Sequence, residues 1–340
     1  MKQSTELRAA ISRTRIRPLA AADLDALVAI DKGVSGRARP GFYEKRLARL
    51  ARDPSAFVAL GAERDGKIVG FIFARLYEGE FGGKLPEAAL DAIGVAVEMQ
   101  RQGIGRLLLD GMTAAMRIHG IAEIATQTDW FDTDLAVFFA EAGFALAPRL
   151  VLERSVGETV GAVPSPRTTS PRVATGAEVD YSSASGDDFA ALSHDRVPIR
   201  SMTSGDVAGM LAIDRRITGR DRTPYFKRKA AEAMDESGIR VSLVAEIDGE
   251  IGGFVMARVE FGEFGSLEPE AVLDTIGVAA SHGHKGIGSA LISQLMTNLV
   301  GLRIEHVRTE VDWNHFGLLS FLDRMGFHPY RRLALRRVVG

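Results

Sequence analysis

Apolar and polar positions along the chain switch between a period of two and a helical period, which predicts a mixed α/β fold. The early positions predict, in order, a strand, two helices and two strands over Ile16–Leu19, Ala21–Ile30, Gly41–Arg52, Ala56–Glu63 and Lys67–Leu76. Asp65-Gly66 joins the last two runs, and this dipeptide is typical of a two-residue β-hairpin turn.

A strand-turn-helix-strand unit follows. Its elements are expected over Ala89–Val97 (strand), Gln100–Gly105 (turn), Arg106–Gly120 (helix), Glu123–Thr128 (strand), Asp134–Ala142 (helix) and Ala147–Ser155 (last strand). Antiparallel hairpins followed by such a unit predict an α/β (α+β) domain, in which helices flank a mixed, mostly antiparallel sheet.

The whole pattern occurs twice, because the sequence aligns with itself without a gap at an offset of 183 residues. Gly103-Ile104-Gly105 meets Gly286-Ile287-Gly288 in this alignment. The only two tryptophans, Trp130 and Trp313, also meet, and we expect both to pack in the core. The chain is therefore interpreted as a duplicated domain.

The repeat sets the expected domain boundaries. A tail over 1–13 precedes a first domain over 14–155, and a second domain covers 197–340. The segment between them, 156–196, is rich in Gly, Ser, Thr, Pro and Asp and cannot bury enough apolar surface to fold alone. It is expected to be a flexible linker.

Composition narrows the function classes. The 340 residues carry 42 Lys and Arg against 44 Asp and Glu, and a net charge of −2 gives no strong field for nucleic acid or membrane. The absence of cysteine excludes disulfides and a cysteine nucleophile, and it fits a reducing compartment. The polar N-terminus lacks a secretory h-region, and no apolar run approaches the ~18 residues of a membrane span. We expect a cytoplasmic protein.

The most informative stretch is the glycine-containing turn between a strand and a helix. A helix N-terminus presents unpaired N–H groups and a positive dipole end, so such a turn can bind an anion. Gly103 and Gly105 would let a phosphate approach the backbone, although a plain tight turn could use the same glycines. The third glycine of the dinucleotide fingerprint is absent, and so is a Walker Lys-Ser/Thr.

The sequence Gln100-Arg101-Gln102-Gly103-Ile104-Gly105 resembles the Gln/Arg-x-x-Gly-x-Gly/Ala signature of the GCN5-related N-acetyltransferase (GNAT) superfamily. The strand before it, the helix after it and the later Gly143-Phe144 match as well. The second repeat has Gly283-His284-Lys285-Gly286-Ile287-Gly288, which keeps both glycines but lacks the leading Gln or Arg. The resemblance covers almost all of each repeat and implies two tandem GNAT-like domains.

The resemblance also implies acetyl-CoA, or another acyl-CoA, as the donor. Its pyrophosphate would bind the backbone amides of each turn, and the preceding strand would pair with the pantetheine arm and polarise the thioester. The implied residues are Ile93, Val95, Arg101, Gln102, Gly103, Ile104, Gly105 and Arg106, and in the second repeat Ile276, Val278, His284, Lys285, Gly286, Ile287, Gly288 and Ser289. His282 and His284 lack companions at ligand spacing, so no metal is expected.

Carboxylates near these strands are candidate general bases for an amine acceptor. Asp91 and Asp274 lie where some family members, polyamine acetyltransferases among them, keep a glutamate base; the alternative is a structural pair with arginine. Glu310 is a rival in the second repeat, at a position where ribosomal-protein acetyltransferases keep a glutamate. The tyrosine that often protonates the leaving thiolate is replaced by Phe139 and Leu322.

The loop between the first two helices usually covers the acceptor in this superfamily. Paired arginines there suit a carboxylate or phosphate, and a loop-fixing Asp–Arg salt bridge is the alternative. Glutamates in Gly-Glu-Phe-Gly turns could receive a cationic amine, or be plain loop acids. The candidate acceptor residues are Asp31, Arg37, Arg39 and Glu80, and Asp214, Arg220, Arg222 and Glu263.

Two function classes follow. The first is an N-acetyltransferase that moves an acetyl group from acetyl-CoA to a primary amine of a small molecule or a protein. The second is an acyl-CoA-binding regulatory protein in which one or both repeats are catalytically silent. A weaker third hypothesis is an intramolecular pseudo-dimer whose groove accepts a protein lysine. None of them involves nucleic acid or a membrane.

Overall fold

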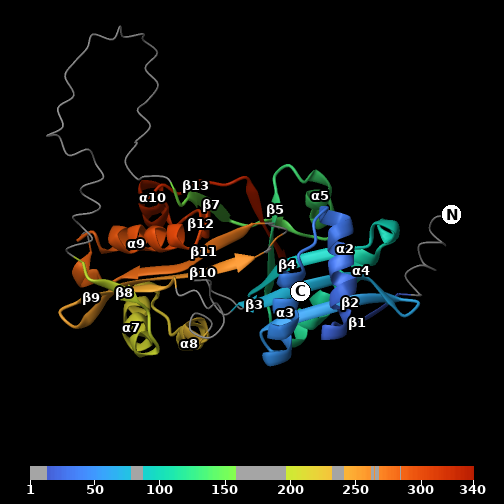
Figure 1. Ribbon diagram of the computed structural model, residues 1–340, viewed down its shortest axis with the longest axis horizontal. Helices are drawn as coiled ribbons and strands as arrows, with labels where there is room; N and C mark the ends of the chain where they lie inside the picture. Colours follow the sequence, from blue (N-terminus) through green and yellow to red (C-terminus); the bar gives the residue numbers. More distant parts are fainter. Residues whose placement is uncertain are drawn as a thin grey trace, which may run out of the picture.

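The computed structural model describes residues 14–77, 87–157, 197–231, 241–261, 264, 268–283 and 285–340. The expected tail and almost all of the expected linker lie outside these residues. The described chain forms two seven-stranded sheets that lie side by side along the long axis of the molecule (Figure 1). None of the described helices combines the length and the apolar character that a bilayer-spanning segment requires.

The first repeat follows the predicted order of elements. They are β1 (Thr14–Pro18), α2 (Leu24–Ser35), α3 (Pro40–Arg52), β2 (Phe57–Arg64), β3 (Lys67–Tyr77), β4 (Glu87–Val95), α4 (Ile104–Ile118), β5 (Glu123–Asp129), α5 (Thr133–Glu141), β6 (Ala145–Leu146) and β7 (Arg149–Ser155). The predicted hairpin turn is present, because Asp65 and Gly66 both have positive φ, 51° and 75°, as a type I′ turn requires. Of these elements, only the two-residue β6 was not expected.

The second repeat has the same order. Its elements are β8 (Ile199–Ser201), α7 (Val207–Thr218), α8 (Thr223–Ala231), β9 (Leu243–Ile247), β10 (Glu250–Phe261), β11 (Pro269–Val278), α9 (Ile287–Gly301), β12 (His306–Asp312), α10 (Phe316–Arg324), β13 (His328–Pro329) and β14 (Arg332–Val338). The α/β class and the mixed, mostly antiparallel sheets with flanking helices are therefore confirmed.

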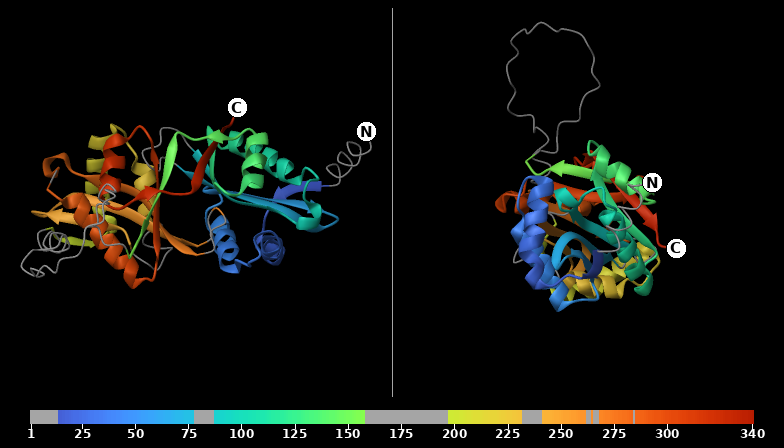
Figure 2. Two further views of the ribbon diagram at one scale, coloured as in Figure 1. Left: turned by 90° about the horizontal axis from the view of Figure 1, so that it is seen from above. Right: turned by 90° about the vertical axis from the view of Figure 1, so that its right-hand side faces the viewer.

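The two repeats exchange their last strands. Strand β7 of the first repeat pairs with β12, with Arg149 opposite Asp312, and so completes the second sheet. Strand β14 of the second repeat pairs with β5, with Arg332 opposite Asp129, and completes the first sheet (Figure 2). The repeated segments of sequence and the two sheets therefore do not coincide, which the self-alignment could not show.

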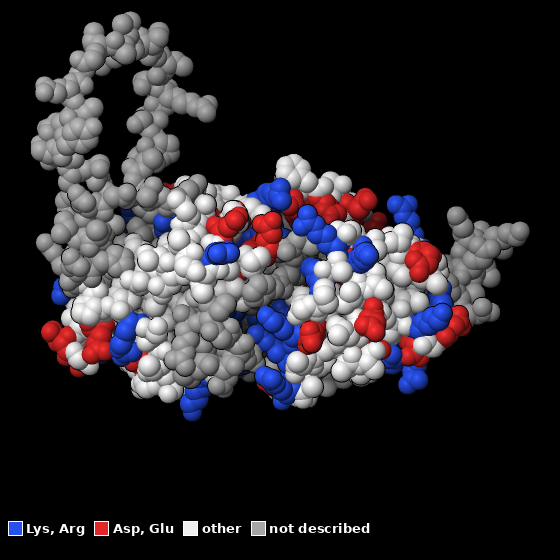
Figure 3. Space-filling view, in the orientation of Figure 1, with Lys and Arg blue, Asp and Glu red and all other residues white. Residues whose placement is uncertain are grey.

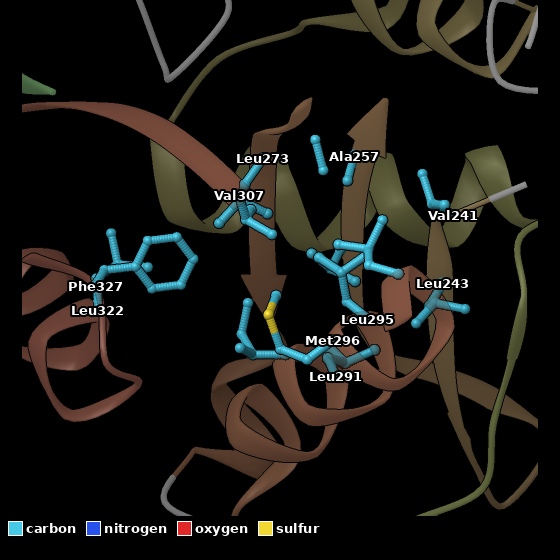
Figure 4. Close-up of a cluster of buried hydrophobic side chains, with 14 of the residues drawn as sticks. Val241, Leu243, Ala257, Leu273, Leu291, Leu295, Met296, Val307, Leu322 and Phe327 are labelled. Carbon is cyan, nitrogen blue, oxygen red and sulfur yellow. The ribbon is translucent and has the colours of Figure 1, made fainter. Parts of the chain in front are cut away.

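Helices cover both faces of each sheet. In the second half, α9 and α10 pack on one face against residues such as Leu243, Leu273 and Val307 (Figure 4), while α7 and α8 cover the other face around Phe254. In the first half, α4 and α5 take one face and α2 and α3 the other. The alternation of core faces along each strand is the period of two seen in the sequence.

The exchange reaches into both cores. Leu335 of β14 is buried in the core under α4, and its counterpart Leu152 of β7 is buried in the core under α9.

The surface of the face seen in Figure 3 carries interspersed acidic and basic side chains.

The seam between the sheets is held by an ionic network around Arg149. Its guanidinium lies 2.5 Å from Glu87, 3.3 Å from Glu310 and 3.4 Å from Asp312. Glu310 also accepts a 2.8 Å hydrogen bond from Gln127 across the seam. Burial raises the pKa of Glu310, and the charge of Arg149 opposes that rise.

The strand exchange predicts where a core mutation acts. We expect Leu335→Ala to destabilise the protein by about 2–5 kcal/mol, and hydrogen–deuterium exchange should accelerate in β4 and β5, which belong to the other repeat. Leu152→Ala is the matched variant and should accelerate exchange in β11 and β12 instead. Acceleration confined to the mutated residue's own repeat in both variants would contradict the exchange.

Candidate active site

The site is built at the point where two parallel strands part. β4 and β5 pair only from Glu87–Glu123 to Ala89–Ala125, although β4 runs on to Val95 and β5 to Asp129. Beyond that point, the Thr126 hydroxyl donates a 3.0 Å hydrogen bond to the carbonyl of Leu90. The main chain of the rest of β4 therefore borders an opening between the strands.

A β-bulge sits at the point of divergence. Phe73 lies opposite Ala92 and Ala74 opposite Leu90, so Asp91 is an extra residue in β4. The second repeat has the same construction, because Met256 lies opposite Thr275 and Ala257 opposite Leu273, which leaves Asp274 as the extra residue. In both repeats the extra residue of the bulge is therefore an aspartate.

The glycine turn that follows β4 has free amides, and a Cβ at its Gly105 would lie 3.9 Å from the side chain of Val95 at the end of β4. α4 begins at Ile104, and its N-cap Gly103 has a φ of 80°, in the left-handed region that favours glycine. Within the described residues, no hydrogen bond to another protein group is made by the backbone N–H groups from Arg101 to Arg106. The first helical bond after the turn is from Leu107 to Gly103. These amides are available to an anion.

The second turn repeats this geometry with one difference. Gly286 caps α9 with a φ of 78°. The amide of Lys285 is 3.4 Å from the carbonyl of His282, a long hydrogen bond, and in the described chain the amides from Gly286 to Ser289 donate to no protein atom. His284 itself lies outside the described residues.

The second glycine of each turn is explained by helix packing rather than by access for a phosphate. A Cβ at Gly105 would lie 3.1 Å from ring atoms of Phe138, and one at Gly288 would lie 3.1 Å from the ring of Phe321. Glycine at these positions therefore lets α5 and α10 pack against the helices that follow the turns. The expected role in phosphate approach rests on Gly103 and Gly286.

A cavity opens between the parted strands in each repeat. The first has a volume of about 700 Å³ and is lined by β4 and β5, by the α2–α3 loop and by residues of the second repeat. The second has about 560 Å³, and all of its lining residues come from the second repeat. The strand exchange brings Arg331 and Arg332, at the start of β14, to the wall of the first cavity.

Two Asp–Arg ion pairs among the predicted acceptor residues line these cavities. Arg39 lies 2.5 Å from Asp31, and both line the first cavity together with the exposed Arg37. Arg222 lies 2.8 Å from Asp214 in the second. The loop-fixing salt bridge, one of the two alternatives, is thus present in both repeats. Arg220 does not line the second cavity.

Two of the candidate acceptor residues, Glu80 and Glu263, lie outside the described residues. Their proposed role toward a cationic amine stays a prediction.

Each of the two candidate bases is one member of a buried ion pair. Asp91 is 1 % exposed, and its Oδ2 lies 2.9 Å from Nη2 of Arg46, which is also buried. Asp274 contacts Arg258 and lies 3.4 Å from Nζ of Lys229. Each carboxylate is held by a buried cation, which would be left unpaired if the carboxylate took up a proton. This geometry favours the alternative role, in which the pair holds the bulge.

Glu310 lies away from the second cavity. It belongs to the seam network with Arg149 and Gln127 and is not among the residues that line either cavity. Phe139 and Leu322, at the usual tyrosine position, are buried and line the first and second cavities respectively. They offer no proton to a leaving thiolate.

The structure adds one polar group that the sequence analysis missed. Thr128 of β5 is buried in the wall of the first cavity, and in the described part of the chain its hydroxyl has no hydrogen-bond partner. The corresponding residue of the second repeat is Val311. A threonine inside a strand has no distinctive sequence signal, so only the three-dimensional arrangement reveals it.

The expectation for the tryptophans was wrong. Trp130 is 62 % exposed and Trp313 is 58 % exposed. Each follows the end of a site strand, and its backbone N–H is held by the carbonyl of Arg331 or of Pro148. Among the described residues, no three His, Asp or Glu side chains gather as metal ligands.

Comparisons with known proteins agree with this geometry. The family model described as Acetyltransferase (GNAT) family matches residues 26–144 and 207–327. A search of curated proteins finds no sequence match.

Solved structures share the fold at low identity. A tandem GNAT protein from the clavulanic acid biosynthesis pathway superposes with a TM-score of 0.64 at 16 % identity, covering 96 % of this chain and 99 % of that one. A GCN5-related N-acetyltransferase from Sphaerobacter thermophilus gives 0.57 at 16 % identity, with 96 % of both chains covered. The glucosamine N-acetyltransferase region of a fungal multi-domain beta-N-acetylglucosaminidase gives 0.61 at 16 %, covering 95 % of this chain and 38 % of that chain.

The buried pair at the first bulge can be tested by stability alone. Asp91→Asn should lower the free energy of unfolding by about 3 kcal/mol, because it leaves the Arg46 guanidinium buried without its carboxylate. Adding Arg46→Met removes the stranded charge and should restore most of the loss, as measured by urea denaturation. A double variant no more stable than the single variant would show that the two residues are not coupled.

Proposed function

Because the chain belongs to the GNAT acetyltransferase family, we propose that it transfers the acetyl group of acetyl-CoA to a primary amine of a small molecule or a protein. One observation carries the proposal. Free amides at a helix N-terminus stand beside two parted strands, and this arrangement occurs in both repeats. The same proposal places the protein in the cytoplasm, where acetyl-CoA and reduced thiols are found.

The coenzyme would be held by main-chain groups. The amides from Arg101 to Arg106 can bind its pyrophosphate, since the helix dipole and the unpaired N–H groups both favour an anion there. The opening along β4 at Ile93 and Val95 can take the extended pantetheine arm. When bound, acetyl-CoA supplies an activated acetyl group as a thioester.

The transfer needs an amine without its extra proton. The amine nitrogen attacks the thioester carbonyl carbon, the new C–N bond forms, the C–S bond breaks and coenzyme A leaves. The nitrogen loses one proton. We assign Asp91 to positioning, because its ion pair with Arg46 fixes the bulge that shapes the opening. The proton then passes to solvent through the cavity, and Thr128 can donate a hydrogen bond to the thiolate.

We assign the chemistry to the first repeat. Its cavity is larger and more polar, and it has the free Thr128 hydroxyl where the second repeat has Val311. The second repeat keeps the free amides of its turn and is proposed to bind the coenzyme without carrying out transfer. A protein that only binds acyl-CoA would bind the coenzyme without acetylating any amine, so a measurement of turnover distinguishes this alternative from the proposed transferase.

Charge reversal at each turn tests this assignment. Arg101 and Lys285 are exposed beside the free amides, so Arg101→Glu and Lys285→Glu should each weaken coenzyme A binding at one site by at least about tenfold. Calorimetry of the unmodified protein should give two sites. Thiol release with amines should fall in Arg101→Glu and persist in Lys285→Glu. Arg216→Glu, on the exposed end of α7, is the matched control.

Absence of coenzyme A binding at millimolar concentration would contradict the proposal as a whole. Equal loss of turnover in the two turn variants would contradict the assignment to the first repeat.

The positioning role of Asp91 gives a separate prediction. The stable double variant Asp91→Asn with Arg46→Met should keep kcat within about fivefold of the unmodified protein, since no proton passes through the carboxylate. A fall in kcat of more than a hundredfold, with stability restored and the KM for acetyl-CoA unchanged, would make Asp91 the general base.

A further inference from the structure

The strand exchange gives the two repeats equivalent arginines with unequal surroundings. Arg149 and Arg332 occupy the same position of the repeat, and each lies opposite an aspartate of the partner strand. Arg149 has carboxylates of Glu87, Glu310 and Asp312 around it. Within the residues that the structure describes, no carboxylate lies at ion-pair distance from Arg332.

Each of the three partners has been lost to a specific change. The equivalent of Glu310 is Gln127, which is neutral. The equivalent of Glu87 is Glu270, which contacts Arg308 instead, and the first repeat has Ala125 at that arginine's position.

The third change concerns the aspartate opposite the arginine. The equivalent of Asp312 is Asp129, which pairs at 3.0 Å with Arg331, where the first repeat has Pro148. The first change removes a negative charge, and the other two direct a carboxylate to another arginine, so that within the described residues none remains at ion-pair distance from Arg332.

That guanidinium lies in the wall of the first cavity. Its Nη1 donates a 2.9 Å hydrogen bond to the carbonyl of Phe264, and its Nε is buried without a partner in the described structure. Burial, and next the positive charge of Arg308, lower the pKa of Arg332. A partly buried cation with no carboxylate at ion-pair distance among the described residues is favourably placed to bind an anion.

We propose that Arg332 binds an oxyanion of the amine acceptor, a carboxylate or a phosphate, in the cavity of the first repeat. The inference rests on the proposed function and names the class of its acceptor, an amine that also carries an anionic group. The site is composite, because the second repeat supplies the anion-binding residue and the first repeat supplies the parted strands.

The geometry of the guanidinium matches that ligand. With Nη1 bonded to Phe264, the edge formed by Nε and Nη2 can make two parallel hydrogen bonds to one carboxylate or phosphate. Arg308 is already held by Glu153 at 3.1 Å, and Arg39 by Asp31 at 2.5 Å. In the part of this wall that the structure describes, Arg332 is therefore a half-buried cation that has capacity left for a ligand.

Two pairs of acceptors test the proposal by thiol release: glycine against glycinamide, and phosphoethanolamine against ethanolamine. The preference for the anionic member, as a ratio of kcat/KM, should fall at least about tenfold in Arg332→Gln, with the KM for acetyl-CoA unchanged. Arg332→Lys, which keeps the charge without the planar fork, should give an intermediate ratio. Arg336→Gln, at an exposed ion pair on the same strand, should leave the ratio unchanged. The pair that responds identifies the anion.

A binding arm needs no turnover. Acetate and inorganic phosphate should raise the melting temperature of the unmodified protein more than that of Arg332→Gln, which should itself melt no lower. An unchanged acceptor preference in Arg332→Gln, or equal stabilisation of both proteins by both anions, would overturn the proposal. If no amine is acetylated by the unmodified protein, the proposed function fails, and the binding arm still decides whether Arg332 holds an anion.

Discussion

The structure depends on the parting of two parallel strands in each repeat. After three paired positions, β4 leaves β5, and one extra residue in β4 directs the change of course. That extra residue is Asp91, which forms a buried ion pair with Arg46, and the helix that follows begins with amides that have no protein partner among the described residues. An anionic group can therefore bind at the amides while an extended chain lies along β4.

The reciprocal strand exchange turns two similar halves into one unit with unlike sites. Because β14 completes the first sheet, the second repeat reaches the wall of the first cavity, while the second cavity is lined by its own repeat alone. Substitutions around the seam then separate the halves further: Arg149 is surrounded by acids, and Arg332 is not. Duplication of this kind lets one copy keep a reaction while the other supplies structure and a ligand contact.

Much of the fold could be read from the sequence, because period and turn chemistry are local properties. Asp65-Gly66 predicted the hairpin, and the glycine turn predicted a helix start at Arg106, where the structure begins α4 at Ile104. The partners of each strand were beyond reach, since Ala147–Ser155 has the same local pattern whichever sheet it joins. The ion pairs of Asp91 and Asp214 depend on residues brought together by folding, so the sequence left two roles open for each. The exposure of Trp130 was mispredicted because aromatic character alone does not decide burial. No local sequence pattern marks Thr128 or Arg332, because what distinguishes each is a hydrogen-bond or ion-pair partner that it lacks among the described residues.

The parted strands and the free amides are together proposed to form the coenzyme site. Hydrogen–deuterium exchange of the whole protein with and without coenzyme A tests it most directly. Exchange is expected to slow at residues 93–95 and 101–106 when the coenzyme is present, and at the equivalent turn of the second repeat. Unchanged exchange at both turns, with coenzyme A bound and protection appearing elsewhere, would contradict it.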